Sequence, residues 1–578
     1  MREIPEQTRL VARAAFPRGS LAMRVRDSLG AVFSDAEFAG LFARRGHPAL
    51  SPAFLAMVSV LQYAEGLTDR QAADAVRGRL DWKYCLALEL NDSGFDASML
   101  SEFRSRLVTG EHSDRLLARV LQVLSEHDLL GPGGRQRTDA THVVADIRLL
   151  NRLELVAETM RAALEALAAA APGWLAAHTV LDWWDRYARR ASDYRLPQAL
   201  PARDELLRTV GQDGFCLLES AYGGRAPDWL REIPAVQVLR QVWVQQYYRD
   251  HVGRCGAREA KDLPPGLLSI GSPYDAEARY SIKRGMAWRG YKAHFTETCP
   301  DDRPRLIVHV DTTEASLADV ETTPARHTAL EAAGFKPDQE LVDAAYVSID
   351  HILTAKQHGI ELTGPLPPDS GWQAPDPDAF DRTHFTIDWD NRHVTCPNGK
   401  RSCYWREASS RDQLPIVQVT FRLLDCTPCP DRARCTRSAH NARAMTFRPC
   451  GQFEAQQRIC ADQATDGWKE QYALRAGVEG TMAQASSRCD VHRARYRGLA
   501  RTHLQHVLAA TALNLVRTDA WLAGIPPRRC MDLASHTTPH HPGRHHVNWP
   551  AGSIKGKLHR SLAPRPGAPG NTRCPQPT

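Results

Sequence analysis

The sequence predicts an α/β fold in which a mixed sheet is flanked by helices. β-prone runs and helical patterns follow one another in the order strand, strand, strand, helix, strand, helix, strand. Two of these strands contain an aspartate that is a candidate functional residue. Asp139 lies within the first strand, RTDATHVV, and Asp343 lies at the end of the fourth, in QELVDAAY.

Composition places few limits on function. Of the 578 residues, 43% are hydrophobic and 24% charged, which is ordinary for a folded protein with large cores. The net charge of +6 allows a nucleic-acid partner without requiring one. The N-terminus has no apolar signal-peptide region and no apolar run is long enough to span a bilayer, so we expect a cytoplasmic protein without membrane contact. Its fourteen cysteines then suggest reduced thiols or metal ligands rather than disulfides.

Residues 1–130 predict an N-terminal helical domain. Ser51 and Thr68 are suited to cap helices there. The segment GLTDRQAADAVRGRLDWKYCLAL resembles a helix, a tight turn and a second helix. Such a pair either docks in a DNA groove as a helix-turn-helix or serves only helical packing and dimerisation.

Residues 131–366 predict the first part of the α/β core. The breaker-rich linker GPGGRQ precedes its first strand. Asn151 and Glu154 resemble a capping box that opens a helical insertion over about residues 150–255. A hairpin of WRGYKAHFTET and RLIVHVDTT follows, and then a helix near residues 324–333.

The pattern changes to a β-rich insertion over residues 367–453, with proline-rich loops and runs such as HFTIDWD and PIVQVTF. Residues 454–524 return to the core. A helical stretch runs to Glu479, and a last amphipathic helix follows with Thr502 as its N-cap. Residues 525–578 are rich in Pro, His and Arg and predict a basic disordered tail.

One acid lies among many bases near the end of the core. Tyr472, Arg475 and Glu479 are spaced i, i+3 and i+7, so a single helix would project all three from one face. The bases that follow are Arg488, Arg493, Arg495, Arg497 and Arg501. This arrangement suits a polyanion, with the arginines on phosphates and the carboxylate on a metal ion. The alternative is a solvated amphipathic helix whose arginines face water.

Six segments form an ordered set: TDATHV, SPYDAEARYSIKRG, GYKAHFTETC, LVDAAYV, YALRAGVEGTMAQ and RARYRGLARTHLQHVLAATALNLVR. Together they resemble the DDE-type transposases of bacterial insertion sequences, in the branch with a long β-rich insertion between the second Asp and the Glu. The resemblance spans about Phe33 to Gly524.

This resemblance implies a ribonuclease-H-like catalytic core in which Asp139, Asp343 and Glu479 bind two divalent metal ions. Close carboxylates repel one another unless cations neutralise them, and hard oxygen ligands suit Mg²⁺ or Mn²⁺. The implied activity is cleavage at insertion-sequence ends and strand transfer into target DNA by phosphoryl transfer. The implied partners are double-stranded terminal inverted repeats and target DNA, bound by a homodimer at the bacterial nucleoid.

The same resemblance assigns DNA contacts to the arginine-rich segment, with Tyr472 and Arg475 on phosphates beside the metal ions. The family often has a lysine seven residues after the Glu, whereas this chain has Ser486 there and Arg488 as the nearest base. Asp275 in SPYDAEARYS is expected to be a turn residue or a supporting contact behind the metal ligands. Two other functions fit these residues: an inactive or domesticated DNA-binding relic, and a plain metal-dependent nuclease.

Cysteines concentrate in the β-rich insertion. A CxxC knuckle, CTPC, lies between the cysteines of TCPNGK and RARC. This spacing predicts a structural zinc site with the ligands Cys396, Cys426, Cys429 and Cys435. The alternative is that these cysteines are small buried hydrophobic residues in a reducing compartment.

Overall fold

The computed structural model describes residues 3–42, 50–191, 196–283, 285–366, 371–373, 376–411 and 413–525. Contacts divide the chain into Met1–Cys530 and Met531–Thr578. The second unit, and all of the predicted tail beyond Ile525, lie outside the described residues. No helix within the described ranges has both the length and the apolar character that a membrane span requires. The finer domain boundaries expected from the sequence stay predictions.

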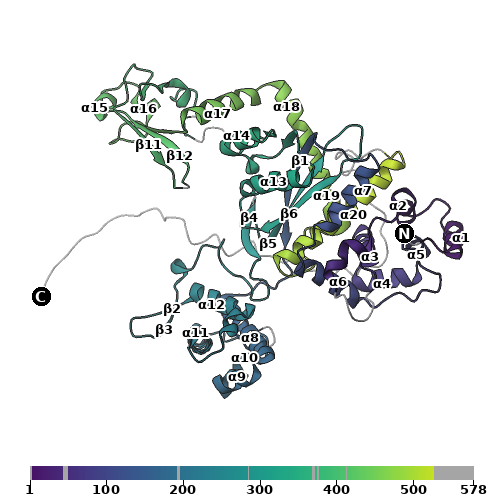
Figure 1. The fold of residues 1–578 in the computed structure, drawn as a ribbon. Coiled ribbons are helices and arrows are strands. Elements are labelled where there is room, and N and C mark those ends of the chain that lie inside the picture. Colours follow the sequence, from purple (N-terminus) through teal and green to yellow (C-terminus); the bar gives the residue numbers. More distant parts are fainter. Residues whose placement is uncertain are drawn as a thin grey trace, which may run out of the picture. The chain divides into compact units, whose positions relative to one another are not determined.

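In the described part of the chain, the central sheet has six strands (Figure 1): β1 (Arg135–Val144), β4 (Arg279–Lys283), β5 (Met286–Thr298), β6 (Ile307–Glu314), β7 (Gln339–Leu341) and β8 (Glu361–Thr363). β5 runs antiparallel to β1, β4 and β6. β7 is parallel to β1, and β8 is parallel to β7. The predicted mixed sheet is confirmed, and so is the predicted order of its strands and helices along the chain. The strand β4 was not expected.

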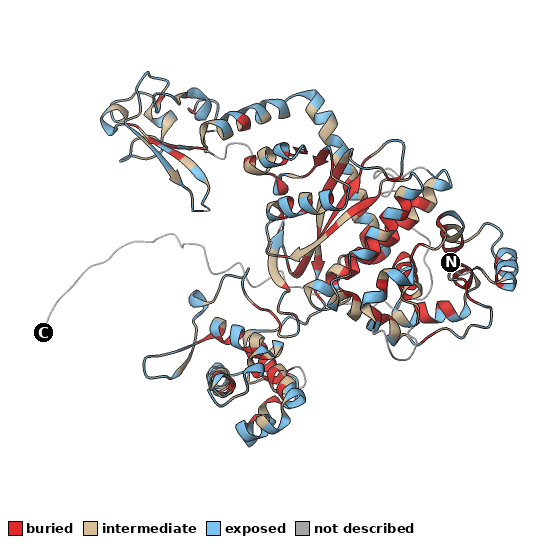
Figure 2. Cartoon of the chain, viewed as in Figure 1, coloured by how far each residue is buried: buried red, intermediate tan, exposed pale blue. Residues whose placement is uncertain are grey.

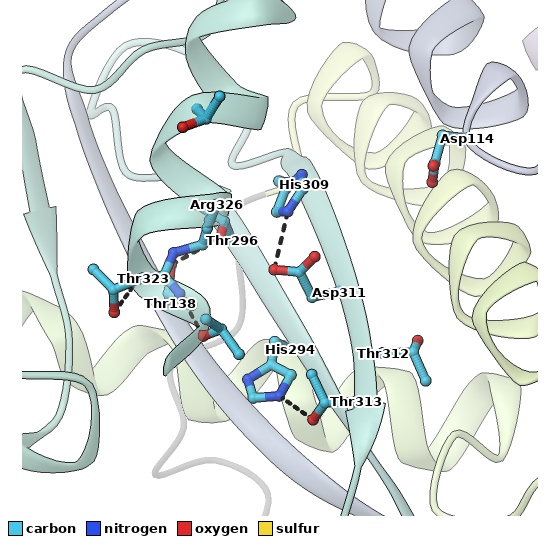
Figure 3. Close-up of polar contacts among 12 residues, drawn as sticks. Asp114, Thr138, His294, Thr296, His309, Asp311, Thr312, Thr313, Thr323 and Arg326 are labelled. Atoms are coloured by element: carbon cyan, nitrogen blue, oxygen red, sulfur yellow. Dashed lines mark hydrogen bonds and ion pairs between the residues drawn. The ribbon is translucent and has the colours of Figure 1, made fainter. Parts of the chain in front are cut away.

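Helices cover both faces of this sheet. α13 (Thr323–Ala332) and α14 (Ile349–Gln357) pack on one face, and α19 (Gly477–Cys489) and α20 (Leu499–Leu522) pack on the other. Successive side chains of β6 point to opposite faces of the sheet. Val310 joins the core that contains α20, whereas Asp311 pairs with His309 on the side of α13 (Figure 3).

α20 is the central helix of the molecule, and it is buried along most of its length (Figure 2). β6 and α3 both contact it. Its polar residue Asn514 is fully buried and bonds to the backbone N and O of Ile307, both at 2.8 Å. The prediction of an amphipathic helix is therefore wrong, and so is the prediction that Thr502 caps it. The helix begins at Leu499, and Thr502 is buried within it.

Six N-terminal helices share one hydrophobic core with the sheet: α2 (Leu21–Leu29), α3 (Pro52–Glu65), α4 (Asp69–Gly78), α5 (Leu80–Cys85), α6 (Ser98–Thr109) and α7 (Arg115–Glu126). Of these, α2, α3, α6 and α7 pack against α20. α1 (Glu6–Ala15) packs on α5 and belongs to a smaller cluster with Met23 and Tyr84. The predicted caps are confirmed, because the Ser51 and Thr68 hydroxyls accept from backbone N–H groups of α3 and α4. Because α2 to α7 share their core with the sheet, their apolar residues are buried against it and against one another.

The helix pair α4 and α5 does not present a recognition helix to solvent. α5 packs against α1 and α2, and Trp82 and Lys83 within it are buried. The Lys83 ammonium donates to the backbone O of Asp92 at 2.7 Å. Because a groove-reading helix needs exposed side chains, the structure favours helical packing over DNA docking for this pair.

Two further groups of elements have hydrophobic clusters of their own. The first contains α8 (Arg152–Ala170), α9 (Pro172–His178), α10 (Leu181–Tyr187), α11 (Leu200–Tyr222), α12 (Pro234–Gln246), β2 (Tyr247–Arg249) and β3 (Cys255–Ala257). The second contains β9 (Thr386–Asp388), β10 (His393–Thr395), β11 (Tyr404–Ser409), β12 (Pro415–Thr420), β13 (Ala444–Phe447), α15 (Leu423–Cys426) and α16 (Arg432–Cys435). The Asn151–Glu154 capping box opens α8, as predicted.

Two histidines are buried in the core around β5, β6 and α20. His294 bonds to the hydroxyls of Tyr346 (2.6 Å) and Thr313 (3.0 Å; Figure 3). His506 bonds to the hydroxyl of Thr312 at 2.7 Å. Burial lowers the pKa of His294 to about 4 and the pKa of His506 to about 3. Both imidazoles are therefore neutral in the folded protein at neutral pH.

We expect the free energy of unfolding to fall as the pH decreases from about 7 to about 5. Histidines of the unfolded chain take up protons near a pKa of about 6.5, whereas His294 and His506 stay neutral in the fold, so acid favours the unfolded state. Each should contribute roughly 1–2 kcal/mol to the loss, measured by chemical denaturation. His506→Gln should reduce the pH dependence, and the exposed control His440→Gln should not. Equal stability at both pH values would contradict this expectation.

Candidate active site

Asp139 lies within β1, and Asp343 lies at the matching position just beyond the end of the neighbouring parallel strand β7. β1 pairs with β7 so that Arg137 faces Leu341, and each aspartate follows its member of that pair by two residues. The two carboxylates therefore lie at the same end of the sheet. The Asp343 side chain is held by the backbone N–H of Ala345, which donates to its Oδ1 at 2.9 Å.

Glu479 reaches the same place from a helix. α18 (Asp466–Ala473) is followed by a 3₁₀ turn, η7 (Leu474–Ala476), and then by α19. The expectation that one continuous helix projects Tyr472, Arg475 and Glu479 is wrong, because the 3₁₀ turn interrupts it and winds more tightly. Glu479 lies in the first turn of α19, with 66% of its side chain exposed.

The Arg475 guanidinium lies among the three acids. Its Nη2 donates to Asp139 Oδ2 at 2.7 Å and lies 3.9 Å from Asp343 Oδ2. Its Nη1 lies 3.9 Å from Glu479 Oε1. The side chains of Arg475 and Asp139 are each only 15% exposed. Residues that are 204 and 136 positions apart in the chain, counted from 139 to 343 and from 343 to 479, thus meet at one cation.

The electrostatics of this place favour a cation. Burial raises the pKa of Asp139; Arg475 opposes the rise, and Asp343 adds to it. Burial also raises the pKa of Tyr472, whose ring stacks on Trp468 at 4.7 Å between centroids, and both aspartates add to that rise. The two aspartates and Tyr472 therefore interact electrostatically. A nearby positive charge stabilises the ionised form of such carboxylates.

A divalent metal ion fits the chemistry of this donor set but not its present spacing. Within the described ranges, no three His, Cys, Asp or Glu side chains are close enough together to hold one metal ion. The Arg475 guanidinium lies between the acids, and its buried Nε has no hydrogen-bond partner. Carboxylate oxygens are the ligands that Mg²⁺ and Mn²⁺ prefer, so Asp139, Asp343 and Glu479 are the residues that could hold such ions.

Two family models match this chain. The model described as Transposase DDE domain matches residues 395–518, and the model described as Transposase domain (DUF772) matches residues 11–106. Both matches support a DDE-type transposase of an insertion sequence. None of the curated proteins matches it. The first matched range includes Glu479, whereas Asp139 and Asp343 lie between the two ranges, so their assignment depends on the geometry described above.

Arg495 and Arg488, which were predicted to bind DNA, contact α3 and the residues that follow it in the transposase. Arg495 lies over the Tyr63 ring, 4.6 Å from its centroid, and donates to the backbone O of Leu67 at 3.3 Å. Arg488 donates to the backbone O of Ala64 at 3.1 Å. Both contacts attach the segment around the end of α19 to α3 and the residues that follow it.

Arg493, Arg497 and Arg501 are exposed, as is Arg488. Arg497 also contacts the protein, because its Nε donates to the backbone O of Asp146 at 3.3 Å and its guanidinium lies 5.6 Å from the centroid of the Tyr274 ring. Ser486 occupies the position where the family often has lysine, and its hydroxyl donates to the backbone O of Met482 at 2.7 Å within α19. The exposed arginines are therefore the better candidates for DNA phosphates, and Ser486 supplies no charge.

Asp275 is a buried contact rather than a surface turn residue. It is 3% exposed and accepts from the hydroxyl of Tyr291 and from the backbone N of Gly498, the latter at 3.3 Å. It thereby joins β5 to the start of α20. It is not among the carboxylates that contact Arg475.

The four predicted zinc ligands line one pocket of about 190 Å³. All four are free thiols: Cys396, Cys426, Cys429 and Cys435. Burial raises the pKa of Cys435, and the other three cysteines add to the rise. N–H groups donate to two of them, from the Lys400 backbone to Cys396 Sγ (3.4 Å) and from the Asn398 side chain to Cys429 Sγ (3.2 Å).

Sequence reasoning missed a buried polar group next to the three acids. It consists of Arg137, Glu297, Thr481 and Arg517, which bond to one another. A charged residue inside a β-prone run, such as Arg137 or Glu297, is the signal that could have found it, because a strand buried on both faces rarely includes an unpaired charge.

Arg475→Gln should destabilise the transposase by about 2 kcal/mol at neutral pH, because it removes a charge-assisted hydrogen bond to Asp139 and leaves the carboxylates to repel one another. Chemical denaturation in EDTA measures the effect. The exposed Arg501→Gln is the matched control and should cost less than about 0.5 kcal/mol. Combining Arg475→Gln with Asp139→Asn should cost less than the sum of the two changes. Additive costs would show that the two side chains do not interact.

Proposed function

We propose that the transposase cleaves DNA at the ends of an insertion sequence and joins the freed strand to target DNA, using Asp139, Asp343 and Glu479 to hold two divalent metal ions. The observation that supports this most directly is the meeting of all three carboxylates at the Arg475 guanidinium. A carboxylate whose pKa is perturbed by burial and by a specific charged partner, as at Asp139, is characteristic of functional sites.

The sheet supports a ribonuclease-H-like core as the scaffold of this site. Three antiparallel strands, β6, β5 and β1, are followed by β7 and β8, which run parallel to β1. In this proposal β1 and β7 supply the two aspartates from adjacent strands, and α19 crosses the sheet and supplies the glutamate. Asp139 is the most enclosed of the three, and Glu479 is the most accessible to substrate.

Bound Mg²⁺ or Mn²⁺ would supply a nucleophile, from water or a DNA 3′-hydroxyl, and stabilise the leaving oxygen during in-line displacement. The chain's own residues orient and bind. Each carboxylate contributes oxygen ligands, and Arg475, displaced from them, is well placed to bind a phosphate next to the site. Tyr472, stacked on Trp468, borders the same place.

Double-stranded DNA is the proposed substrate, as terminal inverted repeats and as target. Arg493, Arg497 and Arg501 are exposed and follow α19 in the chain, so they can reach phosphates that flank the reacting bond. We further propose that two copies act together on paired element ends, in the cytoplasm at the nucleoid. A plain nuclease or a DNA-binding relic would share the arginines but would not join strands.

Asp139→Asn, Asp343→Asn and Glu479→Gln should each reduce cleavage of end-containing DNA by orders of magnitude, because the other two acids cannot replace the missing ligand. Activity should require Mg²⁺ or Mn²⁺ and should be lost with Ca²⁺, whose coordination is larger and looser. Gel assays of cleavage and joining measure both steps. Metal-free DNA binding should survive, since arginine contacts to phosphate dominate affinity.

The exposed Asp490→Asn, also on the α19 segment, is the matched control and should retain activity. Normal cleavage by Glu479→Gln in Mg²⁺ would rule out this glutamate as a ligand. Cleavage without joining would reduce the function to that of a nuclease, and DNA binding without cleavage in the unmodified protein would indicate a relic.

We also propose that Cys396, Cys426, Cys429 and Cys435 bind one structural zinc ion in the β-rich segment. Four thiols line one pocket, and all-sulfur ligation is typical of structural zinc, although the sulfurs of these described residues are spaced too widely here for one ion. N–H groups already donate to two of the sulfurs. Such a site would stabilise a segment whose own apolar cluster is small.

Freshly purified, reduced protein should contain about one zinc ion per chain, and Cys429→Ser should lose it and lower the melting temperature. Elemental analysis and calorimetry measure both. Cys460→Ser, an exposed cysteine outside the pocket, is the control and should keep the metal. Zinc-free protein that melts at the same temperature with and without a chelator would contradict the proposal.

A further inference from the structure

A buried carboxylate, Glu297, joins four elements of the core. It lies on β5 directly opposite Arg137 of β1, and its side chain is 1% exposed. Arg137 Nε donates to Glu297 Oε1 at 2.6 Å, and Arg517 of α20 donates to Oε2 at 2.8 Å. The hydroxyl of Thr481 on α19 donates to the same Oε2. The carboxylate therefore accepts at once from side chains of one neighbouring strand and two helices.

This group is costly to bury and is fully paired. Burial by itself would raise the pKa of Glu297, but the guanidiniums of Arg517 and Arg137 outweigh it and hold the pKa below its usual value. Arg517 Nη2 also donates to the Thr481 hydroxyl at 2.7 Å. Apolar side chains could fill this space, but they would not fix how the helices are oriented on the sheet. Hydrogen bonds to a carboxylate restrict both the distance and the angle between donor and acceptor.

Arg137 also fixes the approach to α19. Its Nη1 donates to the backbone O of Leu474 at 2.7 Å, in the 3₁₀ turn that precedes the helix. A Cβ added at Gly477 would lie only 1.9 Å from Arg137 Nη1. The absence of a side chain at Gly477 therefore lets the first turn of α19 lie directly against the guanidinium.

The first turn of α19 has few other anchors. Its N-cap has no side-chain hydrogen bond. The residues on its buried face are Val478, Thr481, Ala485 and Cys489. Thr481 follows Glu479 by two positions, which is roughly 200° around the helix. A bond that holds Thr481 toward the sheet consequently sets the direction in which Glu479 points on the opposite side.

We propose that Glu297, Arg137, Thr481 and Arg517 form a positioning network that fixes the rotation of α19 and so aims the Glu479 carboxylate at the metal ions. The inference rests on the proposed function, in which Glu479 is a metal ligand. The four residues touch neither DNA nor metal. They act through the helix, as residues behind a metal ligand commonly do.

The network predicts a specific defect. Loosening α19 should weaken the hold on divalent ions and leave DNA affinity nearly unchanged, because the exposed arginines are not part of the network. Excess metal should restore most of the lost rate, since Glu479 is still present. A general loss of stability would instead reduce all activities together and would not respond to metal.

Thr481→Val tests this with the smallest change, because valine keeps the shape and removes the hydroxyl. It should raise the Mn²⁺ dissociation constant, measured by electron paramagnetic resonance of free Mn²⁺, about 10-fold or more. The Mg²⁺ concentration for half-maximal cleavage should rise by a similar factor, with most of the maximal rate recovered at saturation. Thr481→Ser, which keeps the hydroxyl, should behave like the unmodified protein.

Thr511→Val is the matched control, because Thr511 is equally buried, lies on α20, and bonds only to the backbone O of Val507 in its own helix. It should not change the metal requirement. Thr481→Cys, with a weak donor of similar size, replaces Thr481→Val should the latter fail to melt cooperatively, and should show an intermediate metal requirement.

The possible results distinguish a failure of the positioning network from a failure of the proposed function. If Glu479→Gln abolishes cleavage while Thr481→Val binds Mn²⁺ normally, the network is overturned and the proposed function stands. If Thr481→Ser is as defective as Thr481→Val, packing rather than the hydroxyl is responsible, and the network is overturned. If Glu479→Gln cleaves and binds Mn²⁺ normally, the proposed function fails first and the positioning role fails with it.

Discussion

Three carboxylates from distant parts of the chain share one guanidinium, and much of the core is arranged to make that possible. Like charges at this distance repel unless a cation lies among them. Arg475 meets the need through its contacts with Asp139, Asp343 and Glu479. Asp139 lies on β1 and Asp343 just beyond the end of the adjacent parallel strand β7, at the matching register, and this places the two carboxylates together. The glutamate comes from a helix, so its position depends on how that helix is held.

α20 and Glu297 hold that helix from behind. α20 lies between the sheet and the N-terminal helices, so one hydrophobic core extends through both. Its residue Arg517 reaches back to Glu297, and Thr481 of α19 joins the same carboxylate. Hydrophobic burial thus supplies most of the stabilisation, while a few directional bonds decide the orientation of α19. The matched Transposase DDE domain range includes both α19 and most of α20.

Local signals in the sequence predicted most of the sheet and its helices. Caps such as Ser51 and Thr68 and the alternating strand patterns depend on nearby residues, and the structure confirms them. Features that depend on distant partners were missed or wrong. α20 reads as amphipathic because polar Asn514 and Thr502 interrupt its apolar residues, yet both are buried against other elements. The tight turn before α19 depends on Arg137, more than three hundred residues earlier in the chain. The acids were found from their motif context, but their shared partner was expected to bind phosphate only.

The central claim is that Asp139, Asp343 and Glu479 together bind divalent metal ions. The most direct measurement is anomalous diffraction from crystals of the transposase with Mn²⁺ and a DNA fragment that contains an element end. The account predicts two Mn²⁺ peaks within reach of the three side chains, with the Arg475 guanidinium moved away from the carboxylates. Well-ordered carboxylates without Mn²⁺ between them, and with Arg475 still bound to Asp139, would contradict it.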